Sequence, residues 1–244
     1  MSHDRPGGRR VPTGALLVSL AVLTLVSAVV SLALGSEPLE VSGVVDVLRA
    51  RLSGGVGPDP TYDTIVWELR APRIIMGMVV GAGLAMAGAC MQTLVRNPLA
   101  DPYLLGVSAG AAVGATAVIT MGFLGGLGIW ALSGGALVGA LGATLLVYAV
   151  ATATGGLTAL RLILAGVVLS SAFTAVSSFL VFMATDSRSA ETVMHWMLGS
   201  VAGATWSKVP LAAVVVVLAL VVGLALHSWL DAYATGSDTA ASLG

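Results

Sequence analysis

Residues 102–160, PYLLGVSAGAAVGATAVITMGFLGGLGIWALSGGALVGALGATLLVYAVATATGGLTAL, contain no charged side chain in 59 positions. One helix of that length would be about 88 Å long, because each residue adds about 1.5 Å. A bilayer core is only about 30 Å thick, and about 20 apolar helical residues cross it. The run must therefore fold back, and its middle holds a cluster of glycines, the usual turn residues: Gly122, Gly125, Gly126 and Gly128. It predicts two membrane-spanning helices, at about 104–121 and 129–153.

Other charge-free stretches of the same kind lie on both sides of this run. They cover about 14–34, 74–95, 162–185 and 209–230, which brings the expected number of spans to six. The composition agrees, since only 9% of the 244 residues are charged, whereas globular domains carry about 25%. The sequence therefore predicts an all-α polytopic membrane protein, with one transmembrane domain at 14–230 between short tails at 1–13 and 231–244.

Charge and cysteine content exclude several classes of function. The formal net charge is −1, whereas nucleic-acid binding requires a basic surface. Cys90 is the only cysteine, so the chain can form neither an intramolecular disulfide nor a cysteine-cluster metal site. Outside the spans, the apolar pattern of VSGVVDVLRARL predicts an amphipathic helix at Val41–Leu52. A second short helix is expected at Glu191–Leu198.

Basic residues before the first span indicate the orientation of the chain. Arg5, Arg9 and Arg10 precede it, and basic residues concentrate on the cytoplasmic side of membrane proteins. We therefore expect a cytoplasmic amino terminus. An even number of spans then returns the carboxyl end to the same side.

Small residues recur at four-residue spacing on three of the expected helices. Such residues let helix backbones approach closely in lipid, where no hydrophobic effect drives association. Three packing grooves are expected: Gly77, Gly81 and Ala85; Gly106, Gly110 and Gly114; Gly135, Gly139 and Ala143.

The segment from 69 to 114, LRAPRIIMGMVVGAGLAMAGACMQTLVRNPLADPYLLGVSAGAAVG, carries the clearest helix boundaries. Pro72 is expected at the start of the second spanning helix, where its missing N–H costs nothing. Asn97 is expected to end that helix, since a following proline disfavours the α conformation. Asp101 is predicted to cap the next helix, with Pro102 at its first position.

This order of motifs resembles the FecCD-type permease family, the membrane subunits of ATP-driven importers for iron-siderophores, haem and cobalamin. The matching residues follow one another over nearly the whole chain after the first span: Arg70-Ala71-Pro72-Arg73, Ala87-Gly88, Gln92, Asn97-Pro98-Leu99-Ala100, Pro102, Leu105-Gly106-Val107-Ser108-Ala109-Gly110-Ala111, Arg161-Leu162-Ile163-Leu164-Ala165-Gly166, Trp196-Met197-Leu198-Gly199-Ser200, Trp206 and Ala240-Ala241-Ser242-Leu243-Gly244. Family members usually have ten spans. The resemblance therefore implies the N-terminal part of a ten-helix permease, and we expect residues 1–244 alone not to transport.

The resemblance also implies partners and a location. It implies a transport subunit that is not an enzyme and holds no cofactor of its own, because ATP is bound by separate ATPase subunits. A second permease chain, identical or homologous, and an extracytoplasmic substrate-binding protein complete such an importer in the cytoplasmic (inner) membrane. Iron-siderophore is the first expected cargo, with haem and cobalamin as alternatives.

The same resemblance assigns roles to individual residues. Arg70 and Arg73 correspond to arginines that dock the binding protein, with anchoring in the lipid headgroup layer as the alternative. Four residues correspond to a cytoplasmic gate: Asn97, Leu99, Ala159 and Leu160. A purely structural corner formed by the Asn-Pro turn and the Asp101 cap is the alternative for the first two.

The stretch at 162–185 corresponds to the helix that lines the transport pathway. Its residues independently show hydroxyl side chains on one helical face: Ser170, Thr174, Ser177 and Ser178. Hydroxyls in helices also bond to their own backbone, which leaves a structural alternative open. No acidic residue lies within the expected spans, and this disfavours a proton relay.

Two other functions fit single features of the sequence. The segment Gly106-Val107-Ser108-Ala109-Gly110 spells the G-x-S-x-G motif of serine hydrolases. That motif requires a preceding strand and a histidine–acid pair, whereas a proline-capped turn is predicted before Ser108. His195 and His227 are expected at the membrane interfaces. A secondary carrier would normally contain a buried ionisable pair, and the sequence predicts none.

Overall fold

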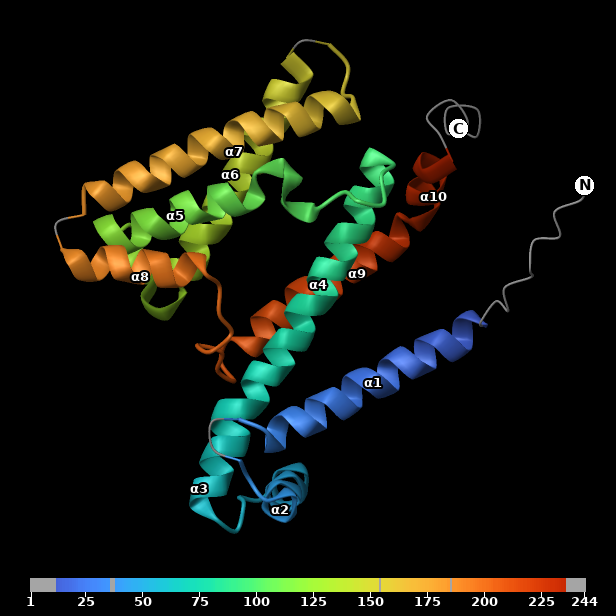
Figure 1. The fold of residues 1–244 in the computed structure, drawn as a ribbon, viewed down its shortest axis with the longest axis vertical. Helices are drawn as coiled ribbons and strands as arrows, with labels where there is room; N and C mark the ends of the chain where they lie inside the picture. The colour runs from blue at the N-terminus through green and yellow to red at the C-terminus, as the bar shows by residue number, and fades with distance from the viewer. Residues whose placement is uncertain (1–11, 36–37, 154, 185, 236–244) are drawn as a thin grey trace, which may run out of the picture. The chain divides into compact units, whose positions relative to one another are not determined.

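The computed structural model describes residues 12–35, 38–153, 155–184 and 186–235, and every regular element among them is helical (Figure 1). In chain order these elements are α1 Thr13–Ala33, α2 Val41–Leu52, α3 Pro60–Asp63, η1 Thr64–Arg70, α4 Ala71–Val95, η2 Pro102–Leu105, α5 Val107–Met121, η3 Gly125–Trp130, α6 Ala131–Ala153, α7 Ala159–Phe182, α8 Ser187–Met197, α9 Val209–Ala225 and α10 His227–Thr235. The element η1 is a π-helix, and η2 and η3 are 3₁₀ helices. The predicted all-α fold is confirmed. Arg5, Arg9, Arg10 and the Ala240–Gly244 match lie outside the described residues.

Each of the six expected spans contains an apolar helix. Among the described residues, four helical stretches are long and apolar enough to cross a membrane: Thr13–Ala33, Pro60–Val95, Gly125–Ala153 and Ala159–Phe182. The apolar helices α5 and α9 are shorter, with 15 and 17 residues. The expected start of α5 at 104 is wrong, because η2 and the left-handed Gly106 (φ 70°) precede it.

The last expected span, 209–230, is not one continuous helix. Helix α9 ends at Ala225 and α10 begins at His227. The His227 ring nitrogen lies 2.7 Å from the Leu224 carbonyl oxygen. A side chain that bonds to a backbone carbonyl in this way competes with the helical hydrogen-bond ladder.

The second spanning helix begins well before Pro72. Helical residues continue from Pro60 through η1 to Val95. A proline inside an α-helix clashes with the carbonyl four residues earlier and leaves it without a donor. In η1 the turn is wider, and the Ala71 N–H bonds to the Val66 carbonyl five residues back. This extra residue accommodates the proline, so the prediction that Pro72 marks the helix start is wrong.

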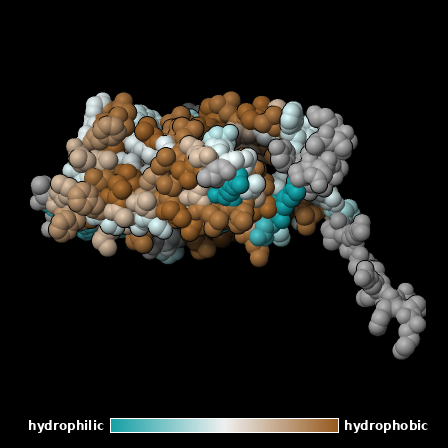
Figure 2. All heavy atoms as spheres, turned by 90° about the horizontal axis from the view of Figure 1, so that it is seen from above, coloured by the Kyte–Doolittle hydropathy of each residue, from teal (hydrophilic) through white to brown (hydrophobic). Residues whose placement is uncertain are grey.

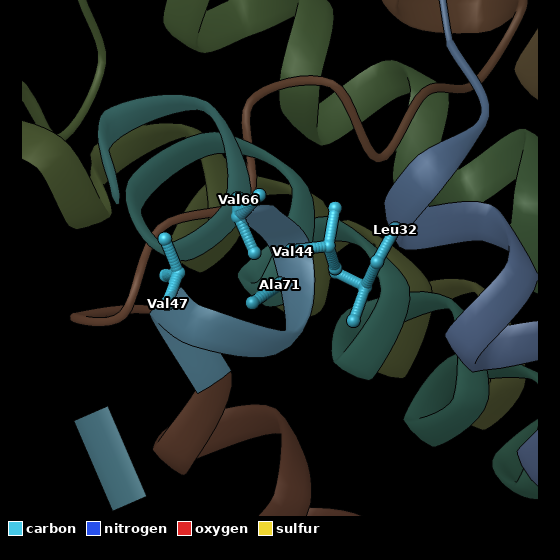
Figure 3. Close-up of a cluster of buried hydrophobic side chains, with 5 residues drawn as sticks. All are labelled: Leu32, Val44, Val47, Val66 and Ala71. Carbon is cyan, nitrogen blue, oxygen red and sulfur yellow. The ribbon is translucent and has the colours of Figure 1, made fainter. Parts of the chain in front are cut away.

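Contacts divide the chain into two compact units. Unit 1 comprises the described residues up to Val79 together with Val201–Val214, and unit 2 comprises the remaining described residues. In unit 1, α2 packs its apolar face against the end of α1 and against η1. The core side chains are at most 8% exposed: Leu32, Val44, Val47, Val66 and Ala71 (Figure 3). The predicted amphipathic helix at Val41–Leu52 is confirmed with the same bounds.

In unit 2, α5 packs against both α6 and α7 (Figure 1). Helices α5 and α6 meet backbone to backbone. A methyl group built on Gly114 would lie 1.9 Å from the Gly135 carbonyl oxygen, and one on Gly139 would lie 2.2 Å from the Gly110 carbonyl oxygen. Two of the three predicted grooves are thus confirmed as packing surfaces. Methyl groups on the glycines of the third groove, on α4, would meet nothing within 4 Å.

The short helix expected at 191–198 is present as α8 and begins one turn earlier. Asp186 caps this helix by accepting the Ser189 N–H through its side chain. The same hydrogen bond lowers the pKa of Asp186, since it favours the ionised carboxylate.

Large apolar side chains are exposed along the spanning helices. Leu25 on α1, Val168 on α7 and Leu224 on α9 are 64%, 67% and 62% exposed. Figure 2 shows hydrophobic residues over most of the face in view. Exposed apolar area of this extent marks a surface that another apolar phase or protein covers, and lipid tails supply that phase for helices of this length.

Candidate functional site

Arg70 and Arg73 lie at the junction of η1 and α4. The Arg70 guanidinium donates from Nη1 to two carbonyls at the end of α1, at 2.7 Å to Leu32 and 3.1 Å to Ala33. A cation at a helix C-terminus satisfies carbonyls that the helix leaves unpaired and is favoured by the helix dipole. Arg70 therefore ties α1 to η1, a structural role that the sequence did not reveal.

Arg73 borders a cavity in unit 1. Its Nε is buried and has no hydrogen-bond partner among the described residues. The cavity measures about 250 Å³ and is lined by Ser31, Leu34, Gly35, Arg70, Arg73 and Ile74. A buried donor without a partner costs about 1–3 kcal/mol. The position suits an incoming carboxylate, because a guanidinium presents paired N–H donors that match its two oxygens.

An ion pair between α2 and α3 holds the loop that connects these two helices. Arg51 Nε donates to Asp63 Oδ1 at 2.9 Å, Arg51 Nη2 donates to the second carboxylate oxygen, and the Gly57 N–H donates to Oδ1 at 3.0 Å. The Arg51 hydrogen bond is the main cause that lowers the pKa of Asp63; burial opposes it, and the Gly57 hydrogen bond adds a smaller lowering effect. This pair fixes the loop beside the segment that carries Arg70 and Arg73.

The turn after α4 is ordered by side chains. Arg96 adopts a left-handed conformation (φ 53°), which often follows the last turn of a helix, although glycine usually occupies that position. The Asn97 N–H donates to the Gln92 carbonyl at 3.1 Å, and Asn97 Oδ1 accepts the Leu99 N–H at 2.9 Å. The predicted helix end at Asn97 and the corner role of this residue are therefore present in the structure.

The predicted cap at Asp101 is also present. Asp101 Oδ1 accepts the Tyr103 N–H at 2.7 Å, with Pro102 in the first position. The capped element is the 3₁₀ helix η2 and not α5. A cavity of about 440 Å³ lies beside the turn and is lined by Ala89, Gln92, Thr93, Arg96, Asn97 and Pro98. Leu99 is 88% exposed.

The second pair of gate candidates, Ala159 and Leu160, forms the first turn of α7. Thr158 caps this helix by accepting the Arg161 N–H at 3.3 Å. Leu160 is 66% exposed. Among the described residues, no hydrogen bond joins this turn to Asn97 or Leu99. Close to both regions in the chain, a packing cluster joins η2 to α6 and α7, and it includes none of the four gate candidates: Leu105, Val147, Ala151, Leu162, Ala165 and Leu169.

The four hydroxyls predicted on α7 have different environments. Ser170 and Thr174 bond to backbone carbonyls four residues earlier, at 2.7 Å and 2.8 Å. Ser177 is 2% exposed and lies 2.9 Å from the Thr116 hydroxyl on α5. Ser177 therefore stabilises the packing of α5 on α7, whereas Thr174 and Ser178 lie exposed on α7.

Ser108 does not occupy a nucleophile elbow. It is the second residue of α5, is exposed, and follows a 3₁₀ helix and the left-handed Gly106. The strand that the G-x-S-x-G motif requires is missing from the described residues before it. The structure therefore gives no support to the hydrolase alternative.

Sequence reasoning missed the contact of Trp206. This residue precedes α9, and its indole Nε1 donates to the Trp67 carbonyl at 2.8 Å. The two rings lie 4.8 Å apart between centroids, and Arg51 lies 5.6 Å from the Trp67 centroid. The sequence held one signal for this contact. Pro72 lies five residues after Trp67 and has no N–H, so the Trp67 carbonyl lacks a backbone donor in a π-helical turn and needs another one.

Comparisons with known proteins agree with this architecture. The model of the FecCD transport family matches residues 23–244. The cobalamin import system permease protein BtuC of Halobacterium salinarum is 40% identical over 188 residues, which cover 77% of this chain and 50% of the relative. The iron-uptake system permease protein FeuC of Bacillus subtilis is 33% identical over 195 residues, which cover 78% and 57%.

A solved structure supports the same grouping. An inward-facing structure described as a metal-chelate type ABC transporter superimposes with a TM-score of 0.79 and 29% identity, over 95% of this chain and 68% of that chain. The chain spans about half the length of the curated relatives that it matches. Motif order, helical fold and family model agree, and the chain belongs to the FecCD transport family.

Proposed function

We propose that this chain is the membrane-spanning permease subunit of an ATP-binding-cassette importer that moves a metal chelate across the cytoplasmic membrane. The likeness to the metal-chelate type transporter over nearly the whole chain carries this proposal. Iron-siderophore is our first candidate cargo, and cobalamin and haem are the alternatives. ATP is bound by separate ATPase subunits, and a second permease chain completes the pathway.

One contact inside unit 1 shows which ends of the spans share a side of the membrane under the proposed span count. Trp67 in η1, which leads into α4, contacts Trp206, which lies shortly before α9. Four spans separate these two residues, so both lie on the same side of the membrane. We assign that side to the exterior, which places the amino terminus and the turn at Asn97 in the cytoplasm.

The exposed residues at the inner turns are the proposed gate. Asn97 and Leu99 form one element, and Ala159 and Leu160 form the other. The exposed Leu99 and Leu160 side chains suit an apolar constriction that excludes water and ions when it is closed. On α7, Thr174 and Ser178 present hydroxyls at helical spacing and are the proposed pathway lining, with Ser170 and Ser177 supporting them through backbone and α5 contacts.

Uptake measurements test the proposed function. Deletion of the gene for this chain is expected to reduce uptake of one labelled chelate to background in starved cells, and expression of the full gene is expected to restore it. Ferric siderophore, cyanocobalamin and haem are compared in parallel, with an unrelated amino acid as the control. Unchanged uptake of all three chelates would contradict the proposal.

Arg70 and Arg73 are the proposed docking residues for the extracytoplasmic substrate-binding protein, and Arg73 is tested because its Nε has no partner among the described residues. Arg73→Glu is expected to weaken association on the order of tenfold at low salt, because a carboxylate on the binding protein would then meet a repelling charge in place of the guanidinium donor. The loss should shrink at high salt, since exposed charges are screened. Surface plasmon resonance on the purified importer measures it, with Arg49→Glu on α2 as the control. Equal association of Arg73→Glu and the wild type at low salt would show that the docking assignment is wrong.

A further inference from the structure

The carbonyl of Trp67 lacks a backbone donor within its own helix. In an α-helix its donor would be the Ala71 N–H, but in η1 that N–H bonds to the Val66 carbonyl. In the π-helical pattern the donor would be residue 72, which is proline and has no N–H. A half-buried carbonyl without a partner is costly, so another group has to supply the hydrogen bond.

The indole of Trp206 supplies it from 139 residues further along the chain. Nε1 donates to the Trp67 carbonyl at 2.8 Å, and the Trp206 ring stacks on the Trp67 ring with centroids 4.8 Å apart. Buried flanks hold Trp206 in place, since Ala204 and Val209 are 8% and 6% exposed. All of these residues belong to unit 1.

The π-helical turn determines where Arg70 and Arg73 point. It contains one residue more than an α-helical path, and one residue corresponds to a rotation of about 100° about the helix axis. A return to the α pattern would therefore rotate α4 and Arg73 relative to the end of α1, whose residues line the same cavity as Arg73. Arg70 would be pulled from the carbonyls of Leu32 and Ala33 that it now contacts.

We propose that Trp206 is a positioning residue for the docking arginines. Its N–H replaces the donor that Pro72 withholds from the Trp67 carbonyl, and it thereby holds the π-helical turn that presents Arg70 and Arg73. The docking part of this inference rests on the proposed function. The hydrogen-bond part rests on the structure of unit 1 alone.

A double-variant cycle tests the hydrogen bond. Trp206→Phe keeps an aromatic ring and removes the N–H, and Pro72→Ala returns a backbone N–H within reach of the Trp67 carbonyl. In the otherwise native protein in detergent, Trp206→Phe is expected to raise the unfolding equilibrium constant, and the amide exchange of residues 64–71, on the order of tenfold. In the Pro72→Ala background the same change is expected to have less than a twofold effect. Trp229→Phe, at a tryptophan that is 64% exposed on α10, is the control and should change neither quantity.

Binding-protein association completes the test. Trp206→Phe is expected to weaken association severalfold, and Trp229→Phe is expected to leave it unchanged. Additive effects in the cycle, or unchanged exchange in residues 64–71, would overturn the role of Trp206 while Arg73→Glu still decides the docking function. If Arg73→Glu weakens association and Trp206→Phe does not, the positioning role is overturned and docking stands. If Arg73→Glu has no effect, the docking function fails, and the exchange data still decide whether Trp206 holds the turn.

Discussion

Replacing Gly139 with alanine is expected to separate α5 from α6 and to destabilise unit 2 by at least about 3 kcal/mol, at the upper end of overpacking effects. The new methyl group would lie 2.2 Å from the Gly110 carbonyl oxygen and 3.0 Å from the Gly110 carbonyl carbon. These atoms belong to the backbone of a helix and cannot move aside as a flexible side chain would. The helices would have to part, and the close backbone contact that holds them in lipid would be lost.

Gly142→Ala is the matched control for this prediction. It lies on the same helix three residues later, and a methyl group there would meet nothing within 4 Å. Alanine is a better helix former than glycine by about 0.8–1.0 kcal/mol, so this variant is expected to be as stable as the wild type or slightly more stable. Thermal unfolding in detergent, followed by size-exclusion chromatography, measures both. Similar melting temperatures for the two variants would show that the glycine contact does not hold α5 and α6 together.

Asp63→Asn is expected to release the loop between α2 and α3. Asparagine cannot provide the charge that Arg51 meets, and it offers one acceptor oxygen where Arg51 and Gly57 now share two. Removing one partner leaves the other charge without compensation, which costs more than the pair contributes. Amide exchange in residues 53–63 is expected to increase on the order of tenfold.

Glu68→Gln is the control, because Glu68 is also an Arg51 partner. Its carboxylate lies 3.7 Å from Arg51, and its side chain is 54% exposed. Exposed pairs of this kind contribute little, so exchange in the loop should stay near the wild-type rate. Equal exchange in both variants would contradict a special role for Asp63.

The pH dependence of the same region follows from the lowered pKa of Asp63. A carboxyl whose pKa is lower in the folded state contributes stability above its unfolded pKa, about 3.9. That contribution is lost as the pH falls through the folded value. The wild-type loop should therefore open in acid below about pH 4, whereas the Asp63→Asn loop should already be open at pH 7 and change little.

Much of the fold could be predicted because lipid limits the choices. Long apolar runs can only be helices there, and the flanking charges marked their ends. The α2 bounds followed from a regular apolar period. The helical stretch from Pro60 that leads into α4 could not be found in this way, because a proline is usual at a helix start and only the wider turn of η1 made an interior position for Pro72 possible.

The site residues were predicted less completely than the fold. The turns at Asn97 and Asp101 could be predicted, since each side chain accepts a hydrogen bond from a backbone N–H two residues later in the same turn. The Arg70 contact with α1 and the Ser177 contact with α5 depend on packing between distant segments. No spacing rule in the sequence encodes such contacts. The hydroxyl pattern on α7 therefore predicted which residues share a helix face, and it did not predict which of them are buried.

The stacked indoles of unit 1 also give the protein a built-in optical reporter. The chain has five tryptophans, and the centroids of Trp67 and Trp206 lie only 4.8 Å apart. At this separation their electronic transitions couple, so the pair contributes a paired circular-dichroism band that isolated tryptophans do not show. The difference between the circular-dichroism spectra of the wild type and Trp206→Phe isolates this paired band, so it can follow this one region without a label.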